Sequence, residues 1–200
     1  MKIIGLTGSI ATGKSTIATI CRQLGFLVHD SDRAVHEMLA PHGQAVRQIL
    51  ASFPATTYGD IGSEDSGINR PALGKIVFNH PELREQLEEI IHPLVYQHRQ
   101  KFVIRARQSR QRAVMFDIPL LFETSGQHLC DYVIVAWAPE YLQRKRALMR
   151  PFMTAEKFDQ IITTQWPQDE KRRYADLELP SALGKADTAR RLKRWLARTL

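Results

Sequence analysis

The feature that most constrains this chain is a pair of glycines, Gly8 and Gly13, followed directly by Lys14 and Ser15. An apolar segment precedes the pair, and a segment with helical spacing follows it. In a strand–loop–helix unit of this kind, the glycines let backbone N–H groups turn inward toward a phosphate, and the positive end of the helix adds to the attraction. The chain is therefore predicted to bind a nucleotide at the start of an α/β domain.

Short apolar segments alternate with helical patterns along the rest of the chain. The expected strands are residues 2–7, 26–29, 113–116, 132–137 and 177–179. The expected helices are residues 14–24, 33–39, 44–53, 71–78, 81–91, 92–110, 140–149, 154–164, 168–174 and 187–198. Residues 54–70 are rich in Gly, Ser, Thr and Asp and are expected to form a loop. The alternation predicts a five-stranded parallel sheet with helices on both faces, a three-layer α/β/α fold.

Length and composition indicate a single domain with a core of its own. The chain has 200 residues, of which 44% are hydrophobic and 24% charged. It has no apolar run long enough to cross a membrane, and its start lacks the pattern of a signal peptide. Cys21 and Cys130 form no disulfide framework and no metal-binding spacing. We therefore expect a cytoplasmic protein with reduced thiols and no membrane association.

The formal net charge of +7 favours anionic partners. Nucleotide phosphates and nucleic acid both qualify, and composition alone does not choose between them. Basic residues are dense in residues 99–112 and in the C-terminal helix, where a solvated helix face is the simpler explanation. They match no nucleic-acid-binding module, so nucleic acid is not the expected partner.

Three aspartates follow predicted strands, at the edge where parallel sheets bind ligands. Asp30 and Asp32 come after the second strand, and Asp117 ends the third. A carboxylate beside a phosphate loop can orient or deprotonate an acceptor hydroxyl. Asp117 can instead hold magnesium together with the Ser15 hydroxyl, as a Walker-B-type acid does. The alternative for each aspartate is a helix cap or a turn.

Arg146 and Arg150 lie four residues apart and share a helix face. Arginines on a mobile lid can neutralise charge on a phosphoryl group in transfer while closure excludes water. The alternative is again a solvated face. His92, before Pro93, is expected to have a structural or local hydrogen-bonding role.

With these motifs in place, the sequence resembles the dephospho-coenzyme A kinase family over about residues 2–176. The most discriminating segments are residues 91–94 (Ile-His-Pro-Leu) and 117–123 (Asp-Ile-Pro-Leu-Leu-Phe-Glu). The other matching positions are residues 6–15, 30–32 with Ala34, Asn69, Arg70, Leu73, Phe78, Gln143, Arg146, Arg150, Gln165, Ala175 and Asp176.

The resemblance implies transfer of the ATP γ-phosphoryl group to the ribose 3′-hydroxyl of dephospho-coenzyme A, with Mg²⁺ as cofactor. It implies one domain over residues 1–200: a core of about 1–40, 111–138 and 175–200, an acceptor-binding insertion of about 41–110, and a lid of about 139–174. Lys14, Asp32 and Arg146 would be catalytic, with Asp32 as general base. The ATP contacts would be Gly8, Ala11, Thr12, Gly13, Lys14, Ser15, Thr16, Arg146 and Arg150. The acceptor contacts would be Thr7, Asp30, Asp32, His92, Pro119, Leu120, Leu121 and Glu123, and the metal contacts Ser15 and Asp117.

The chain departs from the family pattern at two places. Ser181 stands where many members carry an asparagine near the adenine, and Pro151 follows Arg150 where an acidic residue or Asn is commoner. Two other functions stay open: another small-metabolite or nucleoside kinase on the same core, and a nucleotide-switched protein that binds nucleic acid. We expect a monomer or a small homo-oligomer.

Overall fold

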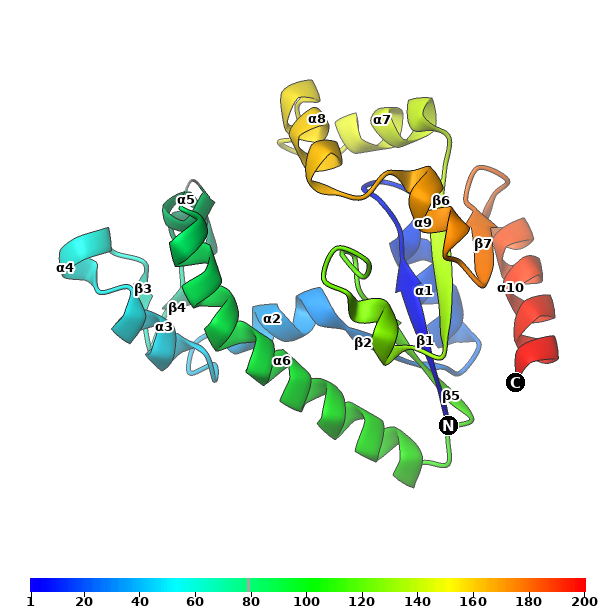
Figure 1. Ribbon diagram of the computed structural model, residues 1–200, viewed down its shortest axis with the longest axis horizontal. Coiled ribbons are helices and arrows are strands. Elements are labelled where there is room, and N and C mark those ends of the chain that lie inside the picture. Colours follow the sequence, from blue (N-terminus) through cyan, green and yellow to red (C-terminus); the bar gives the residue numbers. More distant parts are fainter. Residues whose placement is uncertain (79) are drawn as a thin grey trace. The chain divides into compact units, whose positions relative to one another are not determined.

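The computed structural model describes residues 1–78 and 80–200 (Figure 1). They form two compact units, each with its own hydrophobic core. The first unit comprises Met1–His29 and Ala106–Leu200, and the second comprises Asp30–Arg105. In the described part of the chain, no helix is both long and apolar enough to cross a membrane.

A five-stranded sheet organises the first unit. Its strands are β1 (Lys2–Thr7), β2 (Leu27–Asp30), β5 (Ala113–Asp117), β6 (Tyr132–Trp137) and β7 (Leu177–Pro180), in the order β2-β5-β1-β6-β7. The pairings of β1 with β5 and β6, and of β6 with β7, are parallel. The predicted parallel sheet is therefore confirmed, including its strand near residues 177–179. Because β1 is central, the loop that follows it lies where ligands bind in open parallel sheets.

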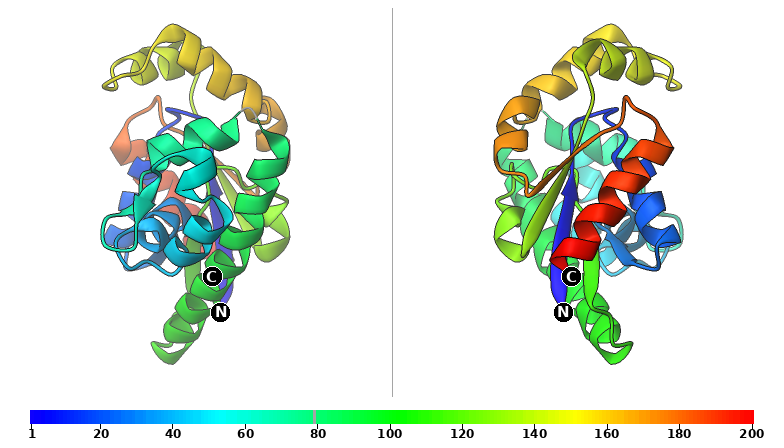
Figure 2. Two further views of the ribbon diagram at one scale, coloured as in Figure 1. Left: turned by 90° about the vertical axis from the view of Figure 1, so that its left-hand side faces the viewer. Right: turned by 90° about the vertical axis from the view of Figure 1, so that its right-hand side faces the viewer.

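One face of this sheet is covered by α1 (Lys14–Gln23) and α10 (Lys185–Thr199), as Figure 2 shows. Ile17 and Cys21 of α1, and Leu192 and Leu196 of α10, recur at a spacing of four and point into the same core. Ile17, Cys21 and Leu192 are fully buried. Burial of an Ile or Leu side chain contributes about 1.5–3 kcal/mol. This packing against the sheet and α10 therefore holds α1, whose first residue is Lys14, in place.

Three further helices follow β6: α7 (Glu140–Leu148), α8 (Ala155–Thr164) and α9 (Gln168–Arg173). Ala147 of α7 and Phe158 of α8 pack with Ala11, which lies in the glycine-containing loop after β1. Thr154 begins α8 as an N-cap, because its hydroxyl accepts a hydrogen bond from Lys157 N. The short 3₁₀ helix η1 (Gly126–Leu129) lies between β5 and β6.

The second unit is mostly helical. It contains α2 (Ser31–Leu39), α3 (Val46–Ser52), α4 (Ala55–Tyr58), β3 (Gly62–Ser63), β4 (Gly67–Ile68), α5 (Arg70–Phe78) and most of α6 (Pro81–Gln108). Its core contains Met38 of α2, Ile49 and the C-cap residue Phe53 of α3, Leu73 of α5 and Val95 of α6.

Two expectations for the second unit were wrong. Residues 54–70 are not all loop, because they contain α4 and the antiparallel pair β3–β4. Ile61 and Ile68 are buried in the core and anchor this hairpin despite its polar composition. Residues 81–110 do not form two helices, since α6 runs through Pro93. Leu83, Leu87 and Leu94 pack against the same core on both sides of the proline, so tertiary packing outweighs the lost hydrogen bond.

Candidate functional site

The loop after β1 has the shape of a phosphate cradle. Gly13 has φ 93°, in the left-handed region where a side chain would be strained, and its N-cap position starts α1. A Cβ atom on Gly8 would lie 2.6 Å from the Ala136 carbonyl oxygen, so only glycine fits there. Thr12 Oγ1 and Thr12 N both donate to Ser9 O and close the loop. The N-terminus of α1 therefore opens toward the space in front of the loop, as phosphate binding requires.

Lys14 and Asp117 meet beside this loop. Lys14 Nζ lies 2.5 Å from Asp117 Oδ1, and both side chains are largely buried. Asp117 ends β5 next to β1, where Leu6 is its register partner, and the parallel sheet thus joins residues 103 positions apart. The ammonium is held at the cradle by a carboxylate, and phosphate oxygens can replace that partner.

The oxygen donors at this edge suit magnesium. Ser15 is exposed at the start of α1, and the Asp117 carboxylate contacts Lys14, the residue that precedes Ser15. Mg²⁺ is usually held by one or two protein oxygens together with substrate phosphates and water. Within residues 1–78 and 80–200 there is no cluster of three or more acidic, His or Cys side chains that could hold a metal by itself. A metal here would be shared with a bound nucleotide.

The segment after β5 runs against β1. Thr7 Oγ1 donates to Pro119 O at 2.9 Å, and Thr7 is fully buried. Leu120 is 41% exposed, whereas Leu121 is fully buried and lies within contact distance of Gly5 and Gly126. Of these predicted acceptor contacts, Leu120 presents its side chain outward. Glu123 is occupied by contacts with Lys171 and Trp166 N.

Arg146 reaches the glycine loop from α7. Its Nη1 atom donates to Ser181 Oγ at 2.6 Å, and its Nη2 atom donates to Ser181 O at 3.1 Å. A Cβ atom on Gly13 would lie 3.9 Å from Arg146 Nη1. Arg150, in contrast, is exposed at the end of α7. The structure therefore brings Arg146, but not the exposed Arg150, into contact with the residues around the cradle.

The remaining predicted residues belong to the second unit. Asp30 begins α2 as its N-cap, because its Oδ1 atom accepts a hydrogen bond from Arg33 N. The capping alternative for Asp30 is thus confirmed. Asp32 is exposed in the first turn of α2, and His92 is exposed on α6.

Sequence reasoning missed the polar contacts that tie residues 165–171 to the site. Gln165 Oε1 accepts from Ile10 N at 3.0 Å, inside the glycine loop. Gln168 accepts from Ala138 N and donates to Ala138 O, at the end of β6. Gln165 is one of the positions that carry the family resemblance, but no local sequence pattern indicates its partner. The two glutamines thus connect the chain after α8 to the glycine loop and to the residue that follows β6.

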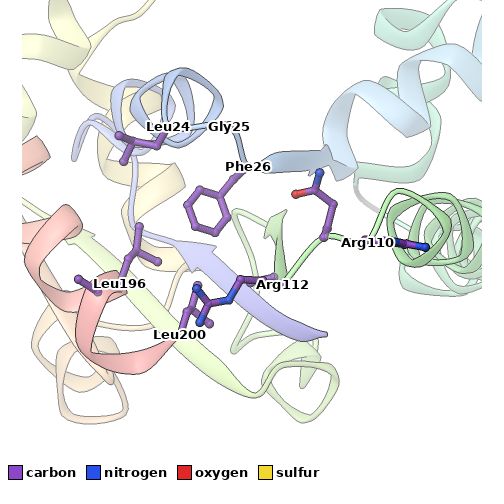
Figure 3. Close-up of a pocket in the computed structure, with 10 residues that line it drawn as sticks. Leu24, Gly25, Phe26, Arg110, Arg112, Leu196 and Leu200 are labelled. Atoms are coloured by element: carbon purple, nitrogen blue, oxygen red, sulfur yellow. The ribbon is translucent and has the colours of Figure 1, made fainter.

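A hollow of about 450 Å³ lies at the opposite edge of the sheet (Figure 3). Phe26 precedes β2 and Arg112 precedes β5, so the hollow is at the amino ends of the strands. Leu196 and Leu200 of the C-terminal segment complete its wall. It includes no residue of the glycine loop, so we do not assign nucleotide binding to it.

Comparison with known proteins gives one consistent result. The family model described as dephospho-CoA kinase matches residues 2–183. A dephospho-CoA kinase of Rhodospirillum rubrum is 44% identical over 191 residues, which are 96% of this chain and 88% of the relative.

Solved structures agree with the sequence matches. A crystal structure from Thermus thermophilus has a TM-score of 0.82 and 28% identity, covering 100% of this chain and 98% of the other. The dephospho-CoA kinase from Campylobacter jejuni has a TM-score of 0.67 and 25% identity, covering 98% and 96%. The cradle, the sheet order and these matches lead to one conclusion: the chain belongs to the dephospho-CoA kinase family.

Proposed function

We propose that this chain transfers the γ-phosphoryl group of ATP to the ribose 3′-hydroxyl of dephospho-coenzyme A, giving coenzyme A and ADP, the last step of coenzyme A synthesis. The observation that carries the proposal is the glycine loop with Lys14 held at its mouth by Asp117, in a chain matched almost end to end by the dephospho-CoA kinase model. The loop accounts for the ATP half of the reaction, and family membership accounts for the acceptor.

Phosphoryl transfer asks mainly for positioning and charge neutralisation. The loop amides of residues 8–16, including Ala11, Thr12 and Thr16, bind the phosphates, and Lys14 and Arg146 neutralise the charge that develops on them. Arg150 adds a cation when the lid closes. Ser15 and Asp117 would hold Mg²⁺ together with the phosphates, and the ion would supply further charge neutralisation.

On the acceptor side, Asp32 is the general base that takes the proton from the ribose hydroxyl. Its exposed position in the first turn of α2 leaves the carboxylate accessible. The further acceptor contacts that the family resemblance implies are Asp30 and His92 in the second unit, and Thr7 with residues 119–123 in the first. Glu123 and Leu121 would support the acceptor contacts without touching the acceptor, because Glu123 is paired with Lys171 and Leu121 is fully buried.

The domain roles follow the family pattern. Residues 41–110 form the acceptor-binding insertion, residues 139–174 form the lid, and the remainder forms the core. The protein works in the cytoplasm as a monomer or small homo-oligomer, without a nucleic-acid or membrane partner.

The test is ADP release from ATP and Mg²⁺ with and without dephospho-coenzyme A. The proposal expects strong stimulation by this acceptor and none by adenosine, AMP or shikimate. Stimulation by one of those three instead would favour another small-metabolite kinase. A salt-sensitive mobility shift with random DNA or RNA, without stimulated turnover, would favour the nucleotide-switched alternative.

A further inference from the structure

We propose that Ser181 is a positioning residue that holds the Arg146 guanidinium beside the glycine loop before nucleotide binds. The inference rests on the proposed function for the role of Arg146 toward phosphate.

The guanidinium is fixed at two points. Arg146 Nη1 donates to the Ser181 hydroxyl at 2.6 Å, and Nη2 donates to the Ser181 carbonyl oxygen at 3.1 Å. Two acceptors on one residue define both the place and the plane of the group. Since a guanidinium carries five N–H donors, three remain for a ligand.

Ser181 is itself fixed to the sheet and packed on the cradle. Its N–H donates to Trp137 O at 3.0 Å, which continues the pairing of β6 with β7. Its Cβ atom would lie 2.8 Å from a Cβ atom on Gly13. Gly13 immediately precedes Lys14, so the serine joins the lid arginine to the loop that carries the other phosphate-binding cation.

A serine can do this without neutralising the arginine. Among residues 1–78 and 80–200, Arg146 has no carboxylate partner, whereas Arg144 of the same helix pairs with Asp159 and Arg172 pairs with Glu178. The Arg146 guanidinium is therefore held in place by neutral acceptors and not by an anion that a phosphate would have to displace. The entropy cost of immobilising the Arg146 side chain is incurred when the protein folds. Phosphate binding therefore does not have to offset this cost.

The experiment is a double-mutant cycle of Ser181→Ala and Arg146→Ala, read as ATP affinity without acceptor and as kcat and KM with it. We expect Ser181→Ala to lower kcat/KM for ATP about tenfold, the scale of a hydrogen bond to a charged group. In the Arg146→Ala background the same change should have less than a twofold effect. Ser181→Asn, which restores a side-chain acceptor, should recover most of the loss. Ser125→Ala, at an exposed serine, is the matched control and should change nothing.

Equal effects of Ser181→Ala with and without Arg146 would overturn the proposal, as would wild-type affinity and rate in the single variant. Thermal unfolding of each variant shows whether it is folded. If Ser181→Ala does not fold, Ser181→Asn replaces it in the cycle with Arg146→Ala. The ATP-affinity cycle needs no acceptor. If dephospho-coenzyme A fails to stimulate turnover while Ser181 and Arg146 remain coupled in ATP affinity, the proposed function fails and this inference stands.

Discussion

Lys171 Nζ lies 2.7 Å from Glu123 Oε1, and the lysine side chain is fully buried while that of Glu123 is 12% exposed. The same carboxylate oxygen accepts a hydrogen bond from Trp166 N at 2.8 Å. Phe122 stacks on the Trp166 ring with an interplanar angle of 13°. The segment after β5 is thus bound to α9 and to Trp166, just before α9, by an ion pair, a hydrogen bond and a ring contact together.

Replacing Lys171 by methionine should destabilise the protein by about 3–5 kcal/mol, because the partly buried Glu123 carboxylate is left without its cation. Chemical denaturation followed by circular dichroism measures the change. The double variant Lys171→Met/Glu123→Leu should regain much of the loss, since an apolar pair avoids the unpaired charge. Lys145→Met, at an exposed lysine of α7, is the control. A loss below 1 kcal/mol for Lys171→Met would contradict the assigned importance of the pair.

Asp131 makes part of the stability depend on pH. Its Oδ2 atom accepts from Ile3 N at 2.8 Å and its Oδ1 atom lies 3.0 Å from Lys2 Nζ. The Ile3 hydrogen bond, helped by Lys2, holds the pKa of Asp131 below its usual value of 3.8. A lowered pKa in the folded state means that the stabilisation is complete above the unfolded value and is lost as the pH falls through the folded one.

We therefore expect Asp131→Asn to be less stable than the wild type at pH 7, with the difference shrinking as the pH falls below about 4. Urea unfolding of both proteins at a series of pH values tests this. Asp65→Asn, at a side chain that is 94% exposed, should track the wild type throughout. A difference that grows in acid would show that the sign is wrong.

The local features of this fold were predictable from the sequence. Gly8 and Gly13 shape the backbone of a short loop, and Lys14 follows directly. The spacing of these three residues alone therefore indicated a phosphate-binding loop. Leu177 and Leu179 were enough to identify β7 despite Glu178 between them. Short apolar segments alternate with helical segments along the chain. This order predicted a parallel sheet, because strand–helix–strand connections allow few other arrangements.

The long-range polar contacts were not predictable in this way. Arg146 meets Ser181 across 35 residues and Gln165 meets Ile10 across 155, and no periodicity encodes such partners. Lys171 lies in a helix whose other residues are mostly charged and exposed, so nothing in its neighbourhood marks it as buried. The hairpin β3–β4 was missed because two buried isoleucines outweigh a composition typical of loops.

Under the proposed function, Lys14→Ala should abolish acceptor-dependent turnover, because it removes the cation proposed to neutralise the outer phosphates. It should also remove the ammonium that faces the buried Asp117 carboxylate, so some loss of stability is expected alongside. Lys14→Met/Asp117→Asn separates the two effects, since it removes both charges and should restore stability without restoring turnover. Coupled ADP release and thermal unfolding give the two readings. Near-normal turnover in Lys14→Ala would remove this lysine from the catalytic assignment.

Asp32→Asn should preserve ATP binding while lowering kcat about 10²–10⁴-fold, the usual scale for loss of a general base. Asp30, and not Asp32, makes the side-chain capping bond of α2, so Asp32→Asn should lower the folding stability by less than about 1 kcal/mol, the scale of a charge in the first helical turn. Asp30→Asn is the matched comparison two residues away, because asparagine still caps α2 and the change removes only the charge. If Asp32→Asn costs less than tenfold while Asp30→Asn costs more, the base is Asp30, and its capping bond to Arg33 N then orients the catalytic carboxylate. Single-turnover rates with saturating ATP separate these outcomes, since they report the chemical step without product release.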